Sequence, residues 1–364
     1  MSFHSLLAFS SLVIISSLFL PILVHSDCGR NPVIFNFGDS NSDTGGFAAA
    51  HGLIFGFPLG RNFFNGVTYR LCDGRLLIDF LCESLKTPYL APYLETVRDN
   101  NVANGANFAV SGSATLPSSN LFNLAVQAFQ FIRFQNRSIA SNTRGIPYSL
   151  SVKDFNNALY TFDIGQNDLA GSFSYLSYTQ VIQKIPSFID EIKNTLWMIY
   201  SHGGRNFWIH NTGPLGCLPE QLVSNRANSR DYDKFGCLSP HNKAANVFNN
   251  QLNDLCKQLR SQMKDAKIVY VDIYTIKYDL IASSSIYGFE KPLMACCGNG
   301  GPPYNFNPNK RCGSTSGYDV CKMGSKFVSW DGTHHTEFAN SIVANKVLSG
   351  NYSTPNLKID FFCK

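Results

Sequence analysis

A serine near one end of the chain and an Asp-x-x-His segment near the other have the residue types of a nucleophilic site. Ser40 follows a short apolar run and Gly38, whereas Asp331 and His334 lie close to the C-terminus. A serine hydroxyl is a poor nucleophile until a base removes its proton, and the base needs a partner that fixes its tautomer. The sequence therefore predicts that Ser40 attacks, His334 accepts the proton and Asp331 orients the histidine. The alternative is structural: Ser40 as a helix N-cap, and the later pair as an Asx-turn beside a surface histidine.

Two further segments have the composition of turns that follow strands. Residues 104–114 are small and include Gly112, and residues 159–168 form an apolar run that ends in Gly-x-Asn-Asp. In this order, the four segments resemble the four sequence blocks of the SGNH hydrolase superfamily, and most closely its plant GDSL esterase/lipase branch. The resemblance extends from about residue 33 to residue 348, which is most of the chain.

The resemblance implies a role for each matching residue. Ser40 matches the nucleophile, and its own N–H, the N–H of Gly112 and the side-chain amide of Asn167 match the oxyanion-hole donors. His334 matches the general base and Asp331 its orienting carboxylate. The implied reaction is acyl transfer through an acyl-enzyme, in a flavodoxin-like α/β sandwich of three layers with a central parallel sheet. The structural alternatives are a turn glycine at position 112 and a helix cap at position 167.

The histidine needs a register argument because His335 directly follows His334. The family pattern places a short Thr-Glu-containing stretch at a fixed offset after its histidine, and Thr336-Glu337 fit that offset for His334. His335 remains the alternative base. Three acidic residues adjoin these blocks and are expected to hold turns through hydrogen bonds to backbone amides: Asp39, Asp43 and Asp168.

The spacing of apolar residues favours an α/β fold. Helical patterns near residues 181–200 and 240–260 separate strand-like runs, and a closing helix is expected from Thr336 to Leu348. Alternation of this kind indicates a parallel sheet covered on both faces, with sites outside the carboxyl ends of the strands. The expected strands are Val33–Phe37, Leu159–Ile164, Phe207–His210 and Ile268–Ile273.

The N-terminal segment predicts entry into the secretory pathway. Residues 1–26 are almost wholly apolar after the first few positions and read as a signal peptide, followed by a single hydrolase domain over residues 27–364. A membrane-spanning signal anchor is the alternative, although no later apolar run is long enough to span a bilayer. The expected location is extracellular, in the cell wall or apoplast, or vacuolar. The sequons at Asn136 and Asn351 predict glycosylation.

The 11 cysteines fit an oxidising compartment, and their odd number leaves at least one unpaired. Closeness in sequence suggests Cys72–Cys82 and Cys217–Cys237. Cys296 and Cys297 are expected to pair with Cys312 or Cys321. No Cys-x-x-Cys pair occurs, so neither a metal site nor a cofactor is predicted.

Composition narrows the functional classes. The formal net charge of +5 is mild and the basic residues are scattered, so neither nucleic acid nor stable membrane insertion is expected. The first hypothesis is a secreted serine esterase acting on a small-molecule or polysaccharide ester. A fucosidase-type glycoside hydrolase is the second, with Asp39 and Asp331 as the two carboxyl groups such enzymes need. A non-catalytic defence or storage glycoprotein is the third. The acyl group, the alcohol and the oligomeric state cannot be read from the sequence.

Overall fold

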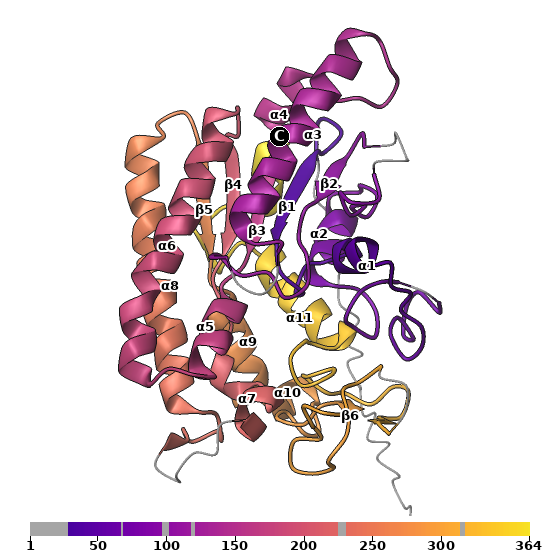
Figure 1. The fold of residues 1–364 in the computed structure, drawn as a ribbon, viewed down its shortest axis with the longest axis vertical. Coiled ribbons are helices and arrows are strands. Elements are labelled where there is room, and N and C mark those ends of the chain that lie inside the picture. The colour runs from indigo at the N-terminus through magenta and orange to yellow at the C-terminus, as the bar shows by residue number, and fades with distance from the viewer. Residues whose placement is uncertain (1–27, 67, 97–101, 118–120, 225–230, 314–316) are drawn as a thin grey trace, which may run out of the picture.

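The computed structural model describes residues 28–66, 68–96, 102–117, 121–224, 231–313 and 317–364. The predicted signal peptide lies outside the described residues. At the centre is a sheet with strand order β2-β1-β3-β4-β5-β8, which is parallel except for β8 at its edge (Figure 1). The first five positions of this order are those of a flavodoxin-like sheet. Its strands are β1 Ile34–Gly38, β2 Gly105–Asn107, β3 Leu159–Asp163, β4 Asn206–His210, β5 Lys267–Val271 and β8 Ser353–Thr354.

Successive strand residues point to opposite faces of the sheet, and each face has its own apolar core. On β1, Phe35 and Phe37 belong to one core cluster and Ile34 belongs to the other. The first cluster includes apolar residues of α3, α5, α6 and α8, and the second includes those of α2, α9 and α11. The predicted three-layer α/β fold is therefore confirmed. These helices are α2 Leu77–Ser84, α3 Leu124–Thr143, α5 Gln166–Phe173, α6 Tyr178–Ser201, α8 Ser239–Gln262, α9 Ile273–Ala282 and α11 Glu337–Leu348.

The predicted elements are present, with small differences at their ends. The expected strands differ from β1, β3, β4 and β5 by at most two residues at either end, and α6 and α8 are longer than the patterns indicated. The closing helix begins as expected, because the Thr336 side chain caps α11 by accepting a hydrogen bond from Ala339 N at 3.2 Å. The shorter elements are α1 Gly46–His51, α4 Val152–Asn157, η1 Leu215–Cys217, α7 Pro219–Ser224, α10 Ser284–Tyr287, β6 Cys297–Gly298, β7 Asp319–Val320 and η3 Ile359–Phe362.

Four disulfides brace the chain, and one predicted pair is wrong. Cys217–Cys237 forms as expected, and the β6–β7 region is closed by Cys296–Cys321 and Cys297–Cys312. The fourth bond joins Cys28 to Cys363, which no local spacing could suggest.

Cys72 and Cys82 do not pair; both thiols are free and buried, as is that of Cys256. Cys82 lies on α2, whereas Cys72 lies in the loop before it, where its Sγ accepts a hydrogen bond from Gly74 N and donates to His335 O. Each sulfur therefore has a separate environment, despite the short sequence separation.

The structure predicts three thiols per chain in denatured, non-reduced protein, measured with a thiol-specific chromophoric reagent. The native protein should react slowly, because all three thiols are buried and burial raises the pKa of each, and the thiolate is the reactive form. Cys256→Ser should reduce the count by one. A single thiol in the denatured wild type would contradict the assignment and indicate that Cys72 and Cys82 are bonded.

Candidate active site

The turn that carries Ser40 is fixed by its contacts with the end of β3 and with α3. A Cβ atom at Gly38 would lie 2.3 Å from the carbonyl oxygen of Asp163, so only glycine fits this close approach. The Gln127 side chain accepts from Gly38 N at 2.9 Å and donates to Gly38 O at 2.8 Å. No motif in the sequence indicated this role for Gln127. These contacts hold the chain rigidly just before Ser40.

Ser40 is buried in the turn and does not cap a helix. The following helix, α1, begins at Gly46 with Gly45 as its N-cap, so the alternative reading of Ser40 as a helix N-cap is wrong. The intervening residues fold instead around Asp43. No described residue forms a hydrogen bond with the Ser40 hydroxyl, which leaves it available to a substrate and a base.

Asp43 ties the Ser40 turn to the segment that contains Gly112. One carboxylate oxygen accepts from Gly45 N at 2.8 Å and Gly46 N at 2.5 Å. The other accepts from Phe47 N at 3.1 Å and Ser111 N at 2.7 Å. Burial raises the pKa of Asp43, and these hydrogen bonds act in the opposite direction. The predicted role of this residue in holding backbone amides is confirmed.

A buried amide network supports the same turn from within the sheet. Asn36 on β1 donates to Asn107 Oδ1 at 2.7 Å, and Asn107 in turn donates to Ser42 O at 2.7 Å and to Thr44 Oγ1 at 2.9 Å. Thr161 Oγ1 donates to Asn36 Oδ1 at 2.7 Å. An asparagine inside an apolar strand is costly unless its amide is satisfied. That cost is the signal by which Asn36 could have been singled out.

Asn167 contacts the Gly112 segment rather than capping a helix. The N-cap of α5 is Gly165, and Asn167 Nδ2 donates to Ser113 O at 2.9 Å. The amide has a second N–H, which this bond does not use. Asp168 holds the same segment, because its carboxylate accepts from Thr115 N at 2.9 Å and from Thr115 Oγ1 at 2.7 Å.

The backbone donors expected of an oxyanion hole form no hydrogen bonds with the described residues. Gly112 has φ +80°, a conformation that favours glycine, and its N–H donates to no described residue. The N–H of Ser40 likewise has no described acceptor. Asn41 connects the Ser40 turn to α5, since its side chain donates to Gln166 Oε1 at 3.3 Å. Hydrogen bonds thus join the three segments that contain Ser40, Gly112 and Asn167.

Asp331 and His334 form a compact hydrogen-bonded pair. Asp331 Oδ1 accepts from Thr333 N at 3.0 Å and His334 N at 2.8 Å, which makes an Asx-turn. Its other oxygen, Oδ2, lies 2.6 Å from His334 Nδ1. The turn and the orienting contact therefore occur together. With a proton on Nδ1 directed at the carboxylate, Nε2 presents a lone pair, and this buried atom has no partner among the described residues.

The electrostatic environment of this pair raises the basicity of His334. Burial alone would lower the pKa of His334, but the charge of Asp331 and the hydrogen bond to it raise that pKa above its ordinary value, with smaller contributions from Asp39 and Glu220. Burial opposes ionisation of Asp331, yet His334 holds the pKa of that carboxyl below its usual range. No described residue forms hydrogen bonds with both the Ser40 hydroxyl and His334 Nε2, and these two groups do not form a hydrogen bond with each other.

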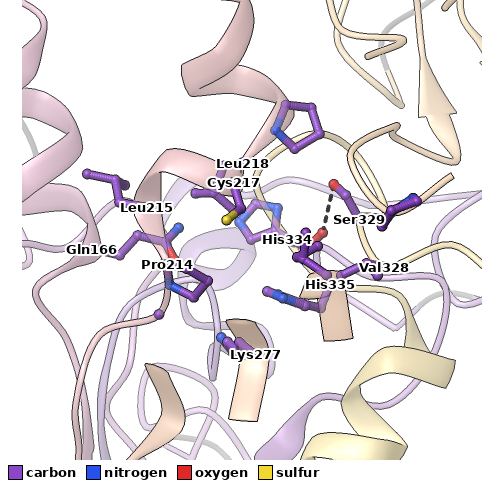
Figure 2. Close-up of a pocket in the computed structure, with 14 residues that line it drawn as sticks. Gln166, Pro214, Leu215, Cys217, Leu218, Lys277, Val328, Ser329, His334 and His335 are labelled. Carbon is purple, nitrogen blue, oxygen red and sulfur yellow. Dashed lines mark hydrogen bonds between the residues drawn. The ribbon is translucent and has the colours of Figure 1, made fainter. Parts of the chain in front are cut away.

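His335 has a different environment from its neighbour. Burial and the nearby charge of Lys277 lower its pKa well below the ordinary value, and its Nδ1 has no described partner. Both histidines line a pocket that also contains Lys277, Gln166 and Pro214 (Figure 2). Of the two histidines, only His334 has a carboxylate at hydrogen-bonding distance, as the register argument expected.

Within the described ranges, no group of three or more His, Cys, Asp or Glu side chains has the arrangement of a metal site. No described helix is both long and apolar enough to span a membrane.

Comparison with known proteins identifies the family of this chain. Residues 34–347 match the model of the GDSL-like lipase/acylhydrolase family. The chain is 54% identical over 346 residues to the Arabidopsis thaliana protein GDSL esterase/lipase At1g09390, covering 94% of this chain and 93% of that protein. It is 43% identical over 364 residues to Alpha-L-fucosidase 3 of the same plant, covering 93% of this chain and 97% of the relative.

Solved structures are more distant. An acetyl-xylooligosaccharide esterase variant from Geobacillus aligns with a TM-score of 0.33 and 11% identity, over 70% of this chain and 82% of the other. A phospholipase A1 from Streptomyces albidoflavus aligns with a TM-score of 0.31 and 15% identity, over 70% and 85% of the two chains. The family model and the plant relatives decide the classification: the chain belongs to the GDSL-like lipase/acylhydrolase family of carboxylic ester hydrolases, as its four sequence blocks predicted.

Proposed function

We propose that the protein is a secreted serine esterase in which Ser40, His334 and Asp331 form the catalytic triad. The observation that carries this proposal is the Asp331–His334 pair, which leaves a buried, unpartnered Nε2 with raised basicity. A histidine in this tautomer can accept the proton of a serine hydroxyl. Ser40 is the nucleophile that the family resemblance assigns, and its hydroxyl is not engaged elsewhere in the described structure.

The proposed reaction proceeds through an acyl-enzyme. Ser40 Oγ attacks the ester carbonyl while its proton passes to His334 Nε2, and Asp331 stabilises the imidazolium that results. The carbonyl oxygen becomes an oxyanion, which the N–H groups of Ser40 and Gly112 and the amide of Asn167 would bind. His334 then protonates the departing alcohol. Water, activated by the same histidine, attacks the acyl-Ser40 ester and releases the acid.

We include in the same proposal that the protein is secreted and that it has a single hydrolase domain. A signal peptide over residues 1–26 would precede one hydrolase domain over residues 27–364, exported to the cell wall, apoplast or vacuole. Four disulfides fit an oxidising compartment. Asn136 and Asn351 are exposed in the described structure, which is compatible with glycosylation at both sequons. The substrate class we propose is a small-molecule or polysaccharide ester.

A fucosidase activity is the second candidate, because one relative is named Alpha-L-fucosidase 3. Glycosidases need two carboxyl groups that face one glycosidic bond. Both oxygens of Asp331 are occupied by its own turn and by His334, whereas Asp39 is fully buried. These contacts favour the esterase. The third candidate, a non-catalytic glycoprotein, gives no reason for a buried histidine with an unused Nε2.

The first prediction of this proposal concerns hydrolysis of p-nitrophenyl acetate, butyrate and palmitate by the purified secreted protein. Ser40→Ala and His334→Ala should each reduce kcat by about 10⁴-fold or more, because the two residues act as a unit. Exposed His51→Ala is the matched control and should retain wild-type rates. Equal rates in the wild type and the Ser40 variant would contradict the triad. Release of fucose from p-nitrophenyl fucoside without ester cleavage would favour the second candidate.

The second prediction concerns the oxyanion hole. Asn167→Ala should lower kcat by about 10²- to 10³-fold with a small change in KM, since the lost donor acts mainly in the transition state. Asn142→Ala is the control, because that amide also donates to a backbone carbonyl, Ser149 O at 3.1 Å, but belongs to the C-terminal end of α3. A loss confined to KM would assign Asn167 to ground-state binding instead.

The third prediction concerns pH. His334 must be neutral to act as a base, and its pKa is raised above the ordinary value of 6.5. The kcat/KM of ester hydrolysis should therefore fall as the pH is lowered through a value above 6.5 and should reach its plateau on the alkaline side. Steady-state rates in overlapping buffers from acid to alkaline pH measure this limb. Full activity retained at pH values well below 6.5 would argue against His334 as the base.

A further inference from the structure

A loop from the N-terminal part of the chain is hydrogen-bonded to the residues that follow the candidate base. This loop precedes α2 and contains Cys72 and Asp73. Cys72 Sγ donates to His335 O at 3.3 Å, and Asp73 Oδ1 accepts from Glu337 N at 2.7 Å. The partners are 263 and 264 residues apart in the sequence. The loop therefore contacts the chain directly after His334.

Asp73 is itself held in place. It is 2% exposed, and its other carboxylate oxygen, Oδ2, accepts from Asn62 Nδ2 at 2.6 Å. The backbone of the same two residues is joined as well, because Asn62 N donates to Asp73 O at 2.7 Å. A buried carboxylate with a donor on each oxygen cannot move without leaving a polar group unpaired. Asp73 is therefore a fixed acceptor for the N–H of Glu337.

That N–H needs an acceptor from outside its own helix. Glu337 is the first residue of α11, and the first N–H groups of a helix have no partner within it. The N-cap, Thr336, accepts from Ala339 N and so does not serve Glu337. Asp73 supplies the missing acceptor, and a negative charge is favourable at a helix N-terminus. The backbone just after His334 is thereby joined to Asp73.

A second contact of the loop reinforces the first. Arg75 Nε donates to Glu337 Oε1 at 2.7 Å, and Asn340 Nδ2 donates to Arg75 O at 3.1 Å. Arg75 Nη1 also donates to Glu83 on α2 at 2.9 Å. The charged groups are partly exposed, and such ion pairs contribute little by themselves. The main restraint therefore lies at the buried Asp73.

The turn that contains His334 is restrained from its other end by different residues. Trp330 N donates to His334 O at 2.7 Å, and the guanidinium of Arg61 lies 5.1 Å from the centre of the buried Trp330 ring. Thr333 Oγ1 donates to Glu220 Oε2 at 2.7 Å. None of these contacts restrains the residues after His334, which is the part that the loop before α2 holds.

We propose that Asp73 is a positioning residue for the catalytic base: its hydrogen bond with Glu337 N fixes the backbone after His334, and so the place of the His334 ring relative to Ser40. The inference rests on the proposed esterase function. Asp331 sets the tautomer of the ring through Nδ1, whereas Asp73 acts only on where the ring lies. A displacement of about 1 Å in a catalytic group can cost about 10²-fold in rate. Loss of the contact should therefore lower kcat.

The test measures kcat and KM for p-nitrophenyl acetate and the rate of inactivation by a fluorophosphonate, each across pH. Asp73→Ala removes the acceptor and should lower kcat and the inactivation rate about ten- to hundredfold, with little change in KM. The acid limb of the profiles should stay in place, because the Asp331–His334 pair is intact. Asp73→Asn keeps an oxygen that can accept from Glu337 N and should restore most of the lost kcat.

A second variant removes the same hydrogen bond from the donor side. Glu337→Pro deletes the N–H at the first position of α11, where proline is well tolerated. Thr336 before it has φ −68° and ψ 160°, a conformation that a following proline allows. The double variant with Asp73→Ala should lose little more kcat than either single variant, because both remove one contact. Glu337→Gln keeps the N–H, weakens only the pairing with Arg75, and should retain most of the activity.

Asp154→Ala is the matched control. Asp154 Oδ2 also accepts a backbone N–H, that of Ser151 at 2.8 Å, but it lies on α4 before β3, at the opposite end of the sheet from the candidate site. This variant should lower the melting temperature without lowering kcat. An equal loss of kcat in Asp154→Ala would assign the effect to stability and overturn the inference.

Wild-type kcat in folded Asp73→Ala overturns the inference and leaves the esterase standing. If Asp73→Ala does not fold, wild-type kcat in Glu337→Pro overturns it equally. Failure of both variants to fold would assign the contact to folding rather than to the base, which also overturns it. A wild type that neither hydrolyses the ester nor reacts with the fluorophosphonate overturns the proposed function as well.

Discussion

Burial of the loops at the carboxyl ends of the strands is the constraint on which the rest of the site depends. A buried backbone N–H must find a partner or cost free energy. Asp43 is a partner for four such N–H groups, because its two oxygens accept from Gly45 N, Gly46 N and Phe47 N after Ser40 and from Ser111 N. Gln127 does the same for Gly38. Against this background, the N–H groups of Ser40 and Gly112 have no acceptor among the described residues, which is why we propose them as oxyanion donors.

The buried charges at the strand ends are likewise stabilised to different degrees by their neighbours. The negative charge of Asp331 is stabilised by His334 and by the hydrogen bonds of its own turn, so the pKa of its carboxyl lies below the usual range despite burial. The hydrogen bonds of Asp39 offset only part of the cost of burying its charge, so burial raises the pKa of its carboxyl. Groups whose environments move their pKa values apart in this way are typical of acid–base sites. The fold concentrates such groups at one end of the sheet, because β3 and β4 end at Asp163 and His210 and Asp39 directly follows β1.

The sequence predicted the features that are local and those carried by the family resemblance. Apolar runs and turn glycines located β1 and β3, and the Thr336 cap located α11. Contacts between distant segments were out of reach: Cys28 pairs with Cys363, and Cys72 faces the loop after His334 instead of its near neighbour. Lys277 was missed although it left a signal, since it interrupts the apolar stripe of α9. A charge at such a position indicates a buried partner.

The proposed function requires that Ser40 is a nucleophile activated by His334. The most direct measurement is mass spectrometric mapping of the protein after reaction with a fluorophosphonate, which forms a stable adduct with an activated serine. We expect one adduct per chain, on the peptide that contains Ser40, and labelling of His334→Ala that is at least about a thousandfold slower, on the order of the loss expected when a triad base is removed. Rapid labelling of another serine, or equal labelling of the wild type and His334→Ala, would contradict it.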